Sequence, residues 1–387
     1  MLLDPATLDL VQRAAAVLAA AGGGALAGGS ISSELFQSEI EVQTPVCETV
    51  AAAETELRQL RLRLQELVHD AGLVLGSAGT HPFAYYEHQQ LTDKARYRSI
   101  VDAVQYPARR ELIFGLHVHV GVGDPEAAIA VLNGLRPHIC DLVALSASSP
   151  FWRGTPTGLR STRQTVFATF PRSGVPPAFG DYAEFAAFVA LLERAGVLED
   201  YTRIWWDIRP HPRLGTVEVR AMDAVGRVED VLAIAAYIQA LARRSAHPQT
   251  RPWRPALEDQ VVRENKWQAV RHGLAAQIVD PRAGGGSCSL SSRILATLDD
   301  LVPAAEELGT LPHLEHLERL VRHGSGAERQ LAAYECAGDV RAAARSIAEE
   351  TDSTDPPPRL TNRVAWRTEP ARTGQDSSRA LARERFS

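Results

Sequence analysis

Several common signatures are missing from this 387-residue sequence. None of its four cysteines forms a Cys-x-x-Cys pair, which excludes zinc-ribbon and thioredoxin motifs. No apolar run reaches about 18 residues, so we expect no membrane span. The N-terminus lacks the basic and apolar regions of a signal peptide. These absences predict reduced thiols and a cytoplasmic protein.

Lysine is almost absent, since Lys94 and Lys266 are the only two. The 41 basic and 47 acidic residues give a net charge of −6, so we expect no binding of nucleic acid through bulk charge. The nucleotide-binding signatures are missing too. There is no Gly-Lys pair and hence no P-loop, and the glycine cluster at 22–29 lacks Rossmann spacing. If the protein binds ATP, metal ions and arginines must hold the phosphates.

What remains is ordinary globular composition, with 45% apolar and 23% charged residues. Periodicity predicts strands separated by helices, followed by a helical third. This pattern favours an α+β fold, with an antiparallel sheet and helices packed on it, in a single domain over residues 1–350. Residues 351–387 are rich in Pro, Ser, Thr and Arg, which predicts a disordered tail. The expected elements are helices at 6–21, 48–71, 94–106, 124–145, 181–195, 227–246 and 258–276, strands at 34–44, 73–77, 112–122, 203–208 and 215–221, and a long loop at 146–177.

Two histidines stand two residues apart in the expected strand 112–122. His117 and His119 therefore point to the same face, about 7 Å apart. That spacing lets one or both imidazoles reach a single metal ion. A hydrogen-bonded structural pair on a polar sheet face explains the pattern equally well, and the sequence leaves both interpretations open.

Glu218 and Arg220 also share one face of an expected strand. A carboxylate beside a guanidinium suits a metal-bound phosphate, because the carboxylate binds the cation and the arginine binds the oxygens. A structural ion pair with Asp207 or Asp223 is the alternative.

Further charged residues occur in the segment 34–44 and near two later positions. Glu34, Glu39 and Glu41 either face a site or form a solvated strand face. Because lysine is so rare, Lys266 suits a point charge on a phosphate. Arg163, in the Ser- and Gly-rich loop, suits an anion-binding lid, although a plain surface loop explains it nearly as well.

These segments together resemble the carboxylate-amine ligase family, the second type of glutamate–cysteine ligase, within the glutamine-synthetase-like superfamily. The resemblance covers about residues 1–350 in the right order. The matching segments are 34–45, Ala78-Gly79-Thr80-His81-Pro82-Phe83, 115–121, 145–150, Trp206-Asp207-Ile208-Arg209-Pro210, 215–223, Glu264-Asn265-Lys266-Trp267 and Gly326-Ala327-Glu328-Arg329-Gln330.

The resemblance implies a six-stranded antiparallel sheet with helices on one face. It also implies that ATP and Mg²⁺, or Mn²⁺, serve to join the γ-carboxylate of glutamate to an amine such as cysteine through an acyl phosphate. The partners are then small molecules, and the chain is expected to be a homodimer. The expected site residues are Glu41, His117 and Glu218 for metal, Glu218 and Arg220 for catalysis, Arg220, Lys266 and Arg163 for phosphates, and Glu34, His119 and Arg209 for substrate.

One departure separates the sequence from its family. Members open with a strand that carries Gly-Val-Glu-Glu-Glu, whereas here Leu2-Leu3-Asp4-Pro5 follows Met1 directly. The departure predicts a reading frame that extends upstream of Met1, or else a non-catalytic paralogue. A His-x-His metal hydrolase is a further alternative, but it leaves Glu218 and Arg220 unexplained.

Overall fold

The computed structural model describes residues 1–353 apart from 27, 247–254 and 281–285. Met1–Ser353 form one compact unit. The predicted disordered tail lies outside the described residues from 354 onward. Its first residues, however, belong to the last helix, α14 (Val340–Asp352), and Thr351 is buried there.

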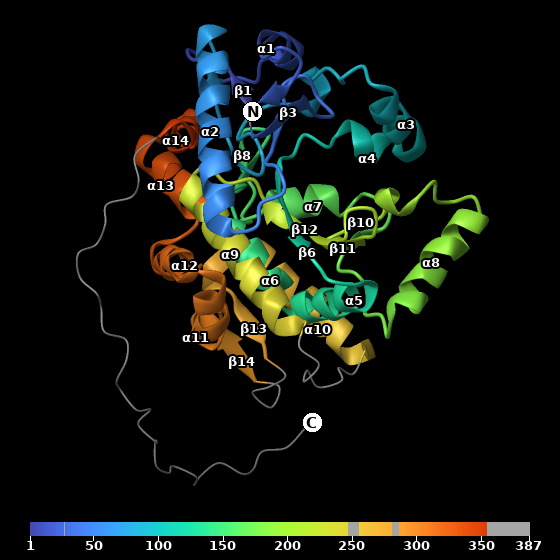
Figure 1. Cartoon of the computed structure of the whole chain (residues 1–387). Helices are drawn as coiled ribbons and strands as arrows, with labels where there is room; N and C mark the ends of the chain where they lie inside the picture. The colour runs from blue at the N-terminus through green and yellow to red at the C-terminus, as the bar shows by residue number, and fades with distance from the viewer. Residues whose placement is uncertain (27, 247–254, 281–285, 354–387) are drawn as a thin grey trace, which may run out of the picture. The chain divides into compact units, whose positions relative to one another are not determined.

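The N-terminal region contains a small antiparallel sheet backed by one long helix (Figure 1). Its strands pair in the order β2-β3-β4, and α2 begins after Thr49, whose hydroxyl accepts a hydrogen bond from Ala52 N. Leu60, Leu64 and Val68 form the buried stripe of that helix. The elements are β1 (Leu2–Leu3), α1 (Ala14–Ala20), β2 (Ala25–Leu26), β3 (Gly29–Ser33), β4 (Ile40–Gln43), α2 (Val50–Asp70) and β5 (Val74–Leu75), which pairs with β1.

Two boundaries here differ from the prediction. The helix expected at 6–21 is confined to Ala14–Ala20, and the strand expected at 34–44 to Ile40–Gln43. The reason is a turn before β4, in which Glu39 N donates to Phe36 O. Glu34 therefore lies outside the strand that carries Glu41.

A second three-stranded antiparallel sheet forms the centre of the molecule. Its strands are β6 (Gly115–Gly121), β11 (Ile208–His211) and β12 (Thr216–Asp223), in the order β11-β12-β6. The helices α5 (Pro125–Leu135), α6 (Ile139–Ser146) and α9 (Val228–Ser245) contact this sheet. Val217 and Val219 are completely buried in the core that these helices form, and the opposite face carries polar side chains.

A β-bulge interrupts the pairing of β12 with β6. Val219 pairs with Val118 and Met222 with Leu116, so β12 has one residue more than its partner between these pairs. The extra residue resets the alternation of side chains. As a result Met222 enters the core, and Asp223 pairs with Gly115.

The α+β class is confirmed, but a continuous six-stranded sheet is not formed among the described residues. The two largest sheets, β2-β3-β4 and β11-β12-β6, have three strands each, and no ladder of hydrogen bonds joins β4 to β6. One short pair, β9 (Ser173–Gly174) with β10 (Trp205–Trp206), is parallel. The pair lies partly in the expected loop 146–177, which also holds β7 (Phe151–Trp152), β8 (Thr155–Pro156) and α7 (Thr162–Phe167).

Helices make up most of the remaining chain, in agreement with the expected helical third. The single stretch apolar and long enough to cross a membrane, among the described residues, is Pro125–Ser146, and 78% of it is buried inside the protein. The other elements are α3 (Ala95–Val104), α4 (Tyr106–Arg109), α8 (Tyr182–Arg194), α10 (Pro255–His272), β13 (Gln277–Val279), β14 (Ser287–Ser289), α11 (Leu290–Leu308), α12 (Leu311–His323) and α13 (Gly326–Ala337), together with the short 3-10 helices 86–88, 136–138, 201–203 and 273–275.

Candidate active site

Five polar residues line the open face of the central sheet, and we call them the charged strip. They are Arg209 on β11, Glu218 and Arg220 on β12, and His117 and His119 on β6. The register places Glu218 opposite Arg209 on one side and His119 on the other. The predicted shared faces are thus confirmed, and the sheet brings together residues from three separate segments.

Glu218 is the centre of the strip, with only 4% of its side chain exposed. Arg209 Nε donates to Glu218 Oε2 at 3.0 Å, and Arg209 Nη2 donates to the same oxygen. Arg209 Nη1 donates at 2.8 Å to the carbonyls of Thr202 and Ile204. In this structure these contacts let Arg209 hold Glu218 in position, and its substrate role remains a prediction.

Arg220 holds the other oxygen of the same carboxylate, because its Nη1 donates to Glu218 Oε1. Burial works to raise the pKa of Glu218, but Arg220 and Arg209 more than offset this and hold that pKa well below its ordinary value. Glu218 is therefore ionised at neutral pH. Arg220 Nε is buried without a hydrogen-bond partner, so one donor of this guanidinium remains available to a ligand.

The two histidines lie beside the same carboxylate. His117 Nδ1 is 3.9 Å and His119 Nε2 is 3.7 Å from Glu218 Oε1, and His119 Nδ1 is 3.0 Å from Thr216 Oγ1. Burial, followed by the charge of Arg220, lowers the pKa of His117, and burial also lowers that of His119. Both rings are neutral at pH 7 and present lone pairs on an accessible face, as metal or substrate binding requires.

Asp223 organises the loop beside the strip, a role that the sequence analysis missed. Its carboxylate accepts hydrogen bonds from Ser148 N (3.0 Å), Ser149 Oγ (2.6 Å) and Ser161 Oγ (2.7 Å). The Ser-rich composition of the loop, next to a lone acid after a strand, was the available signal. The loop is therefore an ordered wall of the site.

Arg163 lies against the start of β6, over a glycine. A Cβ atom on Gly115 would lie 2.5 Å from Arg163 Nη2, so the guanidinium covers this backbone. Arg163 is 3% exposed, and its Nη2 makes a long hydrogen bond of 3.4 Å to Arg220 O. Its Nε and Nη1 have no partner. The predicted anion-binding arginine thus reaches the end of the strip with free donors.

Lys266 does not contact the charged strip. Its ammonium lies 2.8 Å from both carboxylate oxygens of Asp207, which is buried in the protein. In this structure the rare lysine therefore serves as the partner of a buried acid, and its phosphate role remains a prediction.

The acids of the N-terminal sheet form a separate group near the strip. Burial and then the charge of Glu41 raise the pKa of Glu34, whereas Arg220 lowers it, so these residues interact across the two sheets. Burial and Glu34 likewise raise the pKa of Glu39, whose Oε1 is buried without a partner. Mutually repelling carboxylates with an unpartnered oxygen fit a hard divalent cation.

The predicted metal ligands are only partly brought together. His117 and Glu218 adjoin, but Glu41 belongs to the other sheet, where it contacts Ser32 and Gln43. Within the described part of the chain, no three His, Cys, Asp or Glu side chains form a ready metal cluster. The donor types fit a divalent cation, but in this structure the described side chains do not converge on one metal position.

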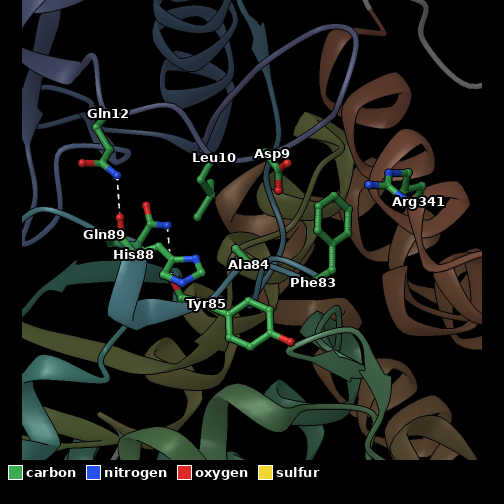
Figure 2. A pocket seen from close by; sticks show the side chains of 9 residues that line it. All are labelled: Asp9, Leu10, Gln12, Phe83, Ala84, Tyr85, His88, Gln89 and Arg341. Carbon is green, nitrogen blue, oxygen red and sulfur yellow. Dashed lines mark hydrogen bonds between the residues drawn. The ribbon is translucent and has the colours of Figure 1, made fainter.

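A pocket of about 300 Å³ lies elsewhere on the molecule (Figure 2). Asp9, Phe83, Tyr85 and His88 surround its opening, and Gln12 Nε2 donates to His88 O at 2.7 Å. None of its nine lining residues belongs to the charged strip. The candidate active site is thus the open sheet face, which sequence reasoning selected, and not this pocket.

Comparisons with known proteins bear on the family of this chain. A model of the glutamate-cysteine ligase family 2 matches residues 1–348. A relative from Rubrobacter xylanophilus, provisionally named glutamate–cysteine ligase 2-1, is 43% identical over 80% of this chain and 82% of its own length. A relative from Solibacter usitatus, provisionally named glutamate–cysteine ligase 2, is 38% identical over 90% of each chain.

Solved structures share the fold at low sequence identity. The glutamate–cysteine ligase of Francisella tularensis, solved in complex with AMP, has a TM-score of 0.62 and 14% identity, covering 84% of this chain and 82% of that chain. A bifunctional glutathione synthetase from Pasteurella multocida has a TM-score of 0.63 over 85% of this chain and 48% of its own. From the matched family model and these relatives, the chain belongs to glutamate–cysteine ligase family 2.

Proposed function

We propose that the chain is an ATP-dependent carboxylate-amine ligase that joins the γ-carboxylate of glutamate to an amine such as cysteine. Family membership supports a ligase of this kind. The observation that carries the proposal is the charged strip, in which one buried carboxylate lies between two arginines and two neutral imidazoles on an open sheet face. Such a face suits polyphosphate chemistry, which depends on positioning and on charge stabilisation.

The reaction has two steps. An oxygen of the substrate carboxylate attacks the γ-phosphorus of ATP and ADP leaves, which gives an acyl phosphate. The neutral amine then attacks the acyl carbon, loses a proton, and expels phosphate as the amide forms. Arg220 is placed to stabilise charge on the transferred phosphoryl group, and Glu218 orients that guanidinium.

A divalent cation such as Mg²⁺, or Mn²⁺, would neutralise phosphate charge when bound. Glu41 on β4, Glu34 and Glu39 in the segment that precedes it, and His117 and Glu218 on the central sheet are the residues that would hold it. For Glu218 to ligate it, the Arg220 contact on Oε1 has to open. Because Arg209 holds Oε2 alone, one oxygen can be released while the carboxylate stays in place.

The test is release of ADP from ATP in the presence of glutamate, cysteine and Mg²⁺, with and without the Glu218→Gln substitution. The amide has nearly the same shape but no charge, so we expect turnover to fall by at least 100-fold, as for lost charge stabilisation in other active sites. The fold should persist, as judged by circular dichroism. Glu193→Gln, on the exposed surface of α8, is the matched control.

The proposal is wrong if wild-type protein releases no glutamate-dependent ADP with any amine in a panel, or if Glu218→Gln keeps full turnover. Stoichiometric zinc in the purified protein, with hydrolytic activity, would favour the metal hydrolase instead. Light scattering of the same preparation tests the homodimer that the family resemblance suggests.

A further inference from the structure

Glu111, which follows α4 and precedes β6, belongs to no pair and no helix cap. Its Oε2 atom is buried without a hydrogen-bond partner. A buried carboxylate oxygen without a partner loses its hydration without compensation, so such an atom points to a missing ligand or to a function.

The charged groups that act on Glu111 are three arginines and the carboxylate of Glu39. Arg163, Arg110 and Arg220 are the charges that act on it most strongly, yet none lies within ion-pair distance of its carboxylate in the described structure. Burial raises the pKa of Glu111 to about 8, against the opposing effect of these arginines. Glu111 is therefore largely protonated at pH 7 in the free protein, and an ammonium group bound beside it would favour its ionised form.

Arg163 supplies the complementary half of this arrangement. Its Nε and Nη1 are also buried without partners, while the guanidinium is fixed over Gly115 and lies 5.4 Å from the centre of the Phe167 ring. An unpaired acceptor and two unpaired donors thus belong to two residues that interact electrostatically, and Arg163 lies at the end of the charged strip.

We infer that Glu111 and Arg163 bind the amino-acid end of the carboxylate substrate, with its α-ammonium on Glu111 and its α-carboxylate on Arg163. A zwitterion satisfies both sets of unpaired atoms, whereas a phosphate satisfies the arginine and brings no cation to Glu111. The inference rests on the proposed ligase function and moves Arg163 from the phosphates, its predicted role, to the substrate.

The experiment measures binding by calorimetry without ATP, using three ligands that differ in one group each. L-glutamate carries both α groups, glutarate lacks the ammonium, and 4-aminobutyrate lacks the α-carboxylate. We expect wild-type protein to bind L-glutamate more tightly than either analogue. Glu111→Gln should weaken the binding of L-glutamate by about 10- to 100-fold, which is the range for hydrogen bonds to charged groups. The affinity for glutarate should stay within about twofold of the wild-type value.

Glu111→Asp keeps the charge on a shorter side chain and should retain part of the preference for L-glutamate over glutarate. Glu193→Gln, on the surface, should leave all three affinities unchanged. Melting curves confirm that each variant is folded, so that loss of one ligand alone is not mistaken for unfolding.

Two results would overturn the inference. One is that Glu111→Gln weakens the binding of L-glutamate and of glutarate equally, and the other is that it weakens the binding of neither. These outcomes are separate from failure of the proposed function. If ligand discrimination depends on Glu111 but the protein never releases ADP, the proposed ligase function is wrong. If the protein is active but its ligand discrimination does not depend on Glu111, only the inference is wrong.

Discussion

At the scale of single residues, the buried polar groups differ in whether all of their atoms have hydrogen-bond partners. Glu218 is fully engaged by Arg209 and Arg220, whereas Glu111 and Arg163 retain unpaired atoms. The first arrangement holds a side chain in place, and the second leaves a position for a ligand. The difference depends on contacts between distant segments, so spacing in the sequence could not reveal it.

His81 shows how such contacts fix a protonation state. Its Nε2 donates to Leu8 O at 2.8 Å, and its Nδ1 accepts from Ala84 N at 3.0 Å and from Phe83 N at 3.3 Å. Burial lowers the pKa of this ring to about 4. The ring is therefore neutral in the folded protein, because a second proton would remove the only acceptor for two backbone N–H groups.

This pKa predicts acid sensitivity. The folded value lies below the unfolded value of 6.5, so the stabilisation is complete above pH 6.5 and is lost as the pH falls towards 4. A pKa unit is worth about 1.4 kcal/mol, so the loss approaches about 3 kcal/mol. His81→Asn should lower the free energy of unfolding at pH 7.5, as measured by urea denaturation. Between pH 7.5 and pH 5 that free energy should fall less in the variant than in wild type. Exposed His323→Asn is the control, and identical slopes for wild type and His81→Asn would contradict the assignment.

At the scale of secondary-structure elements, alternation along β6 and β12 was predictable and correct. His117 with His119, and Glu218 with Arg220, share the faces that a period of two requires. The bulge between Val219 and Met222 was not predictable, because the strand Thr216–Asp223 contains no glycine or proline to mark it. The roles of Asp223 and Glu111 were missed for a related reason: each depends on which loop packs beside it.

The separation of β4 and β6 into two sheets could also not be predicted from the sequence. Strand propensity identifies segments, whereas pairing between segments far apart depends on tertiary contacts. The long loop at 146–177 was predicted as irregular because Ser, Gly and Pro dominate it, yet short elements form where Asp223 and its three donors order the chain.

Gly115 at the start of β6 gives a prediction at this scale. An alanine Cβ there would approach Arg163 Nη2 to 2.5 Å, and the end of a flexible side chain can move away. Gly115→Ala should therefore keep the fold, with stability within about 1 kcal/mol of wild type, but weaken L-glutamate binding by displacing Arg163. Gly121→Ala is the matched control, since a Cβ at the other end of the strand meets nothing within 4 Å. Equal binding by the two variants would show that Arg163 does not contact the ligand.

At the scale of the whole molecule, hydrogen bonds join the N-terminal region to the end of the last described helix. Arg61 and Gln65 on α2 donate to Thr351 O, each at 3.1 Å, and Ser77 N donates to Thr351 Oγ1 at 2.9 Å. The last described helix is thus fastened to the N-terminal region. Family resemblance predicted the extent of this unit, but its end was placed a few residues too early because Thr351–Ser353 look like a polar tail.

Thr351→Val tests this closure. Valine has the same shape but leaves Ser77 N buried without an acceptor, at a cost of about 1–3 kcal/mol. For a protein of this size we expect the thermal midpoint to fall by roughly 2–4 °C or more. Ser353→Ala, two residues further and exposed, should have no measurable effect. An unchanged midpoint for Thr351→Val would show that the helix end is dispensable.

The bulge in β12 also limits how this protein can change during evolution. Glu218 and Arg220 precede it and Asp223 follows it, so the bulge separates the charged strip from the residue that orders the neighbouring loop. Deleting the extra residue at the bulge would leave a regular ladder in which Met222 still pairs with Leu116 and Asp223 with Gly115. Lineages that descend from this chain can therefore shorten the strand by one residue between Val219 and Met222, whereas a deletion elsewhere in the strand would exchange its two faces.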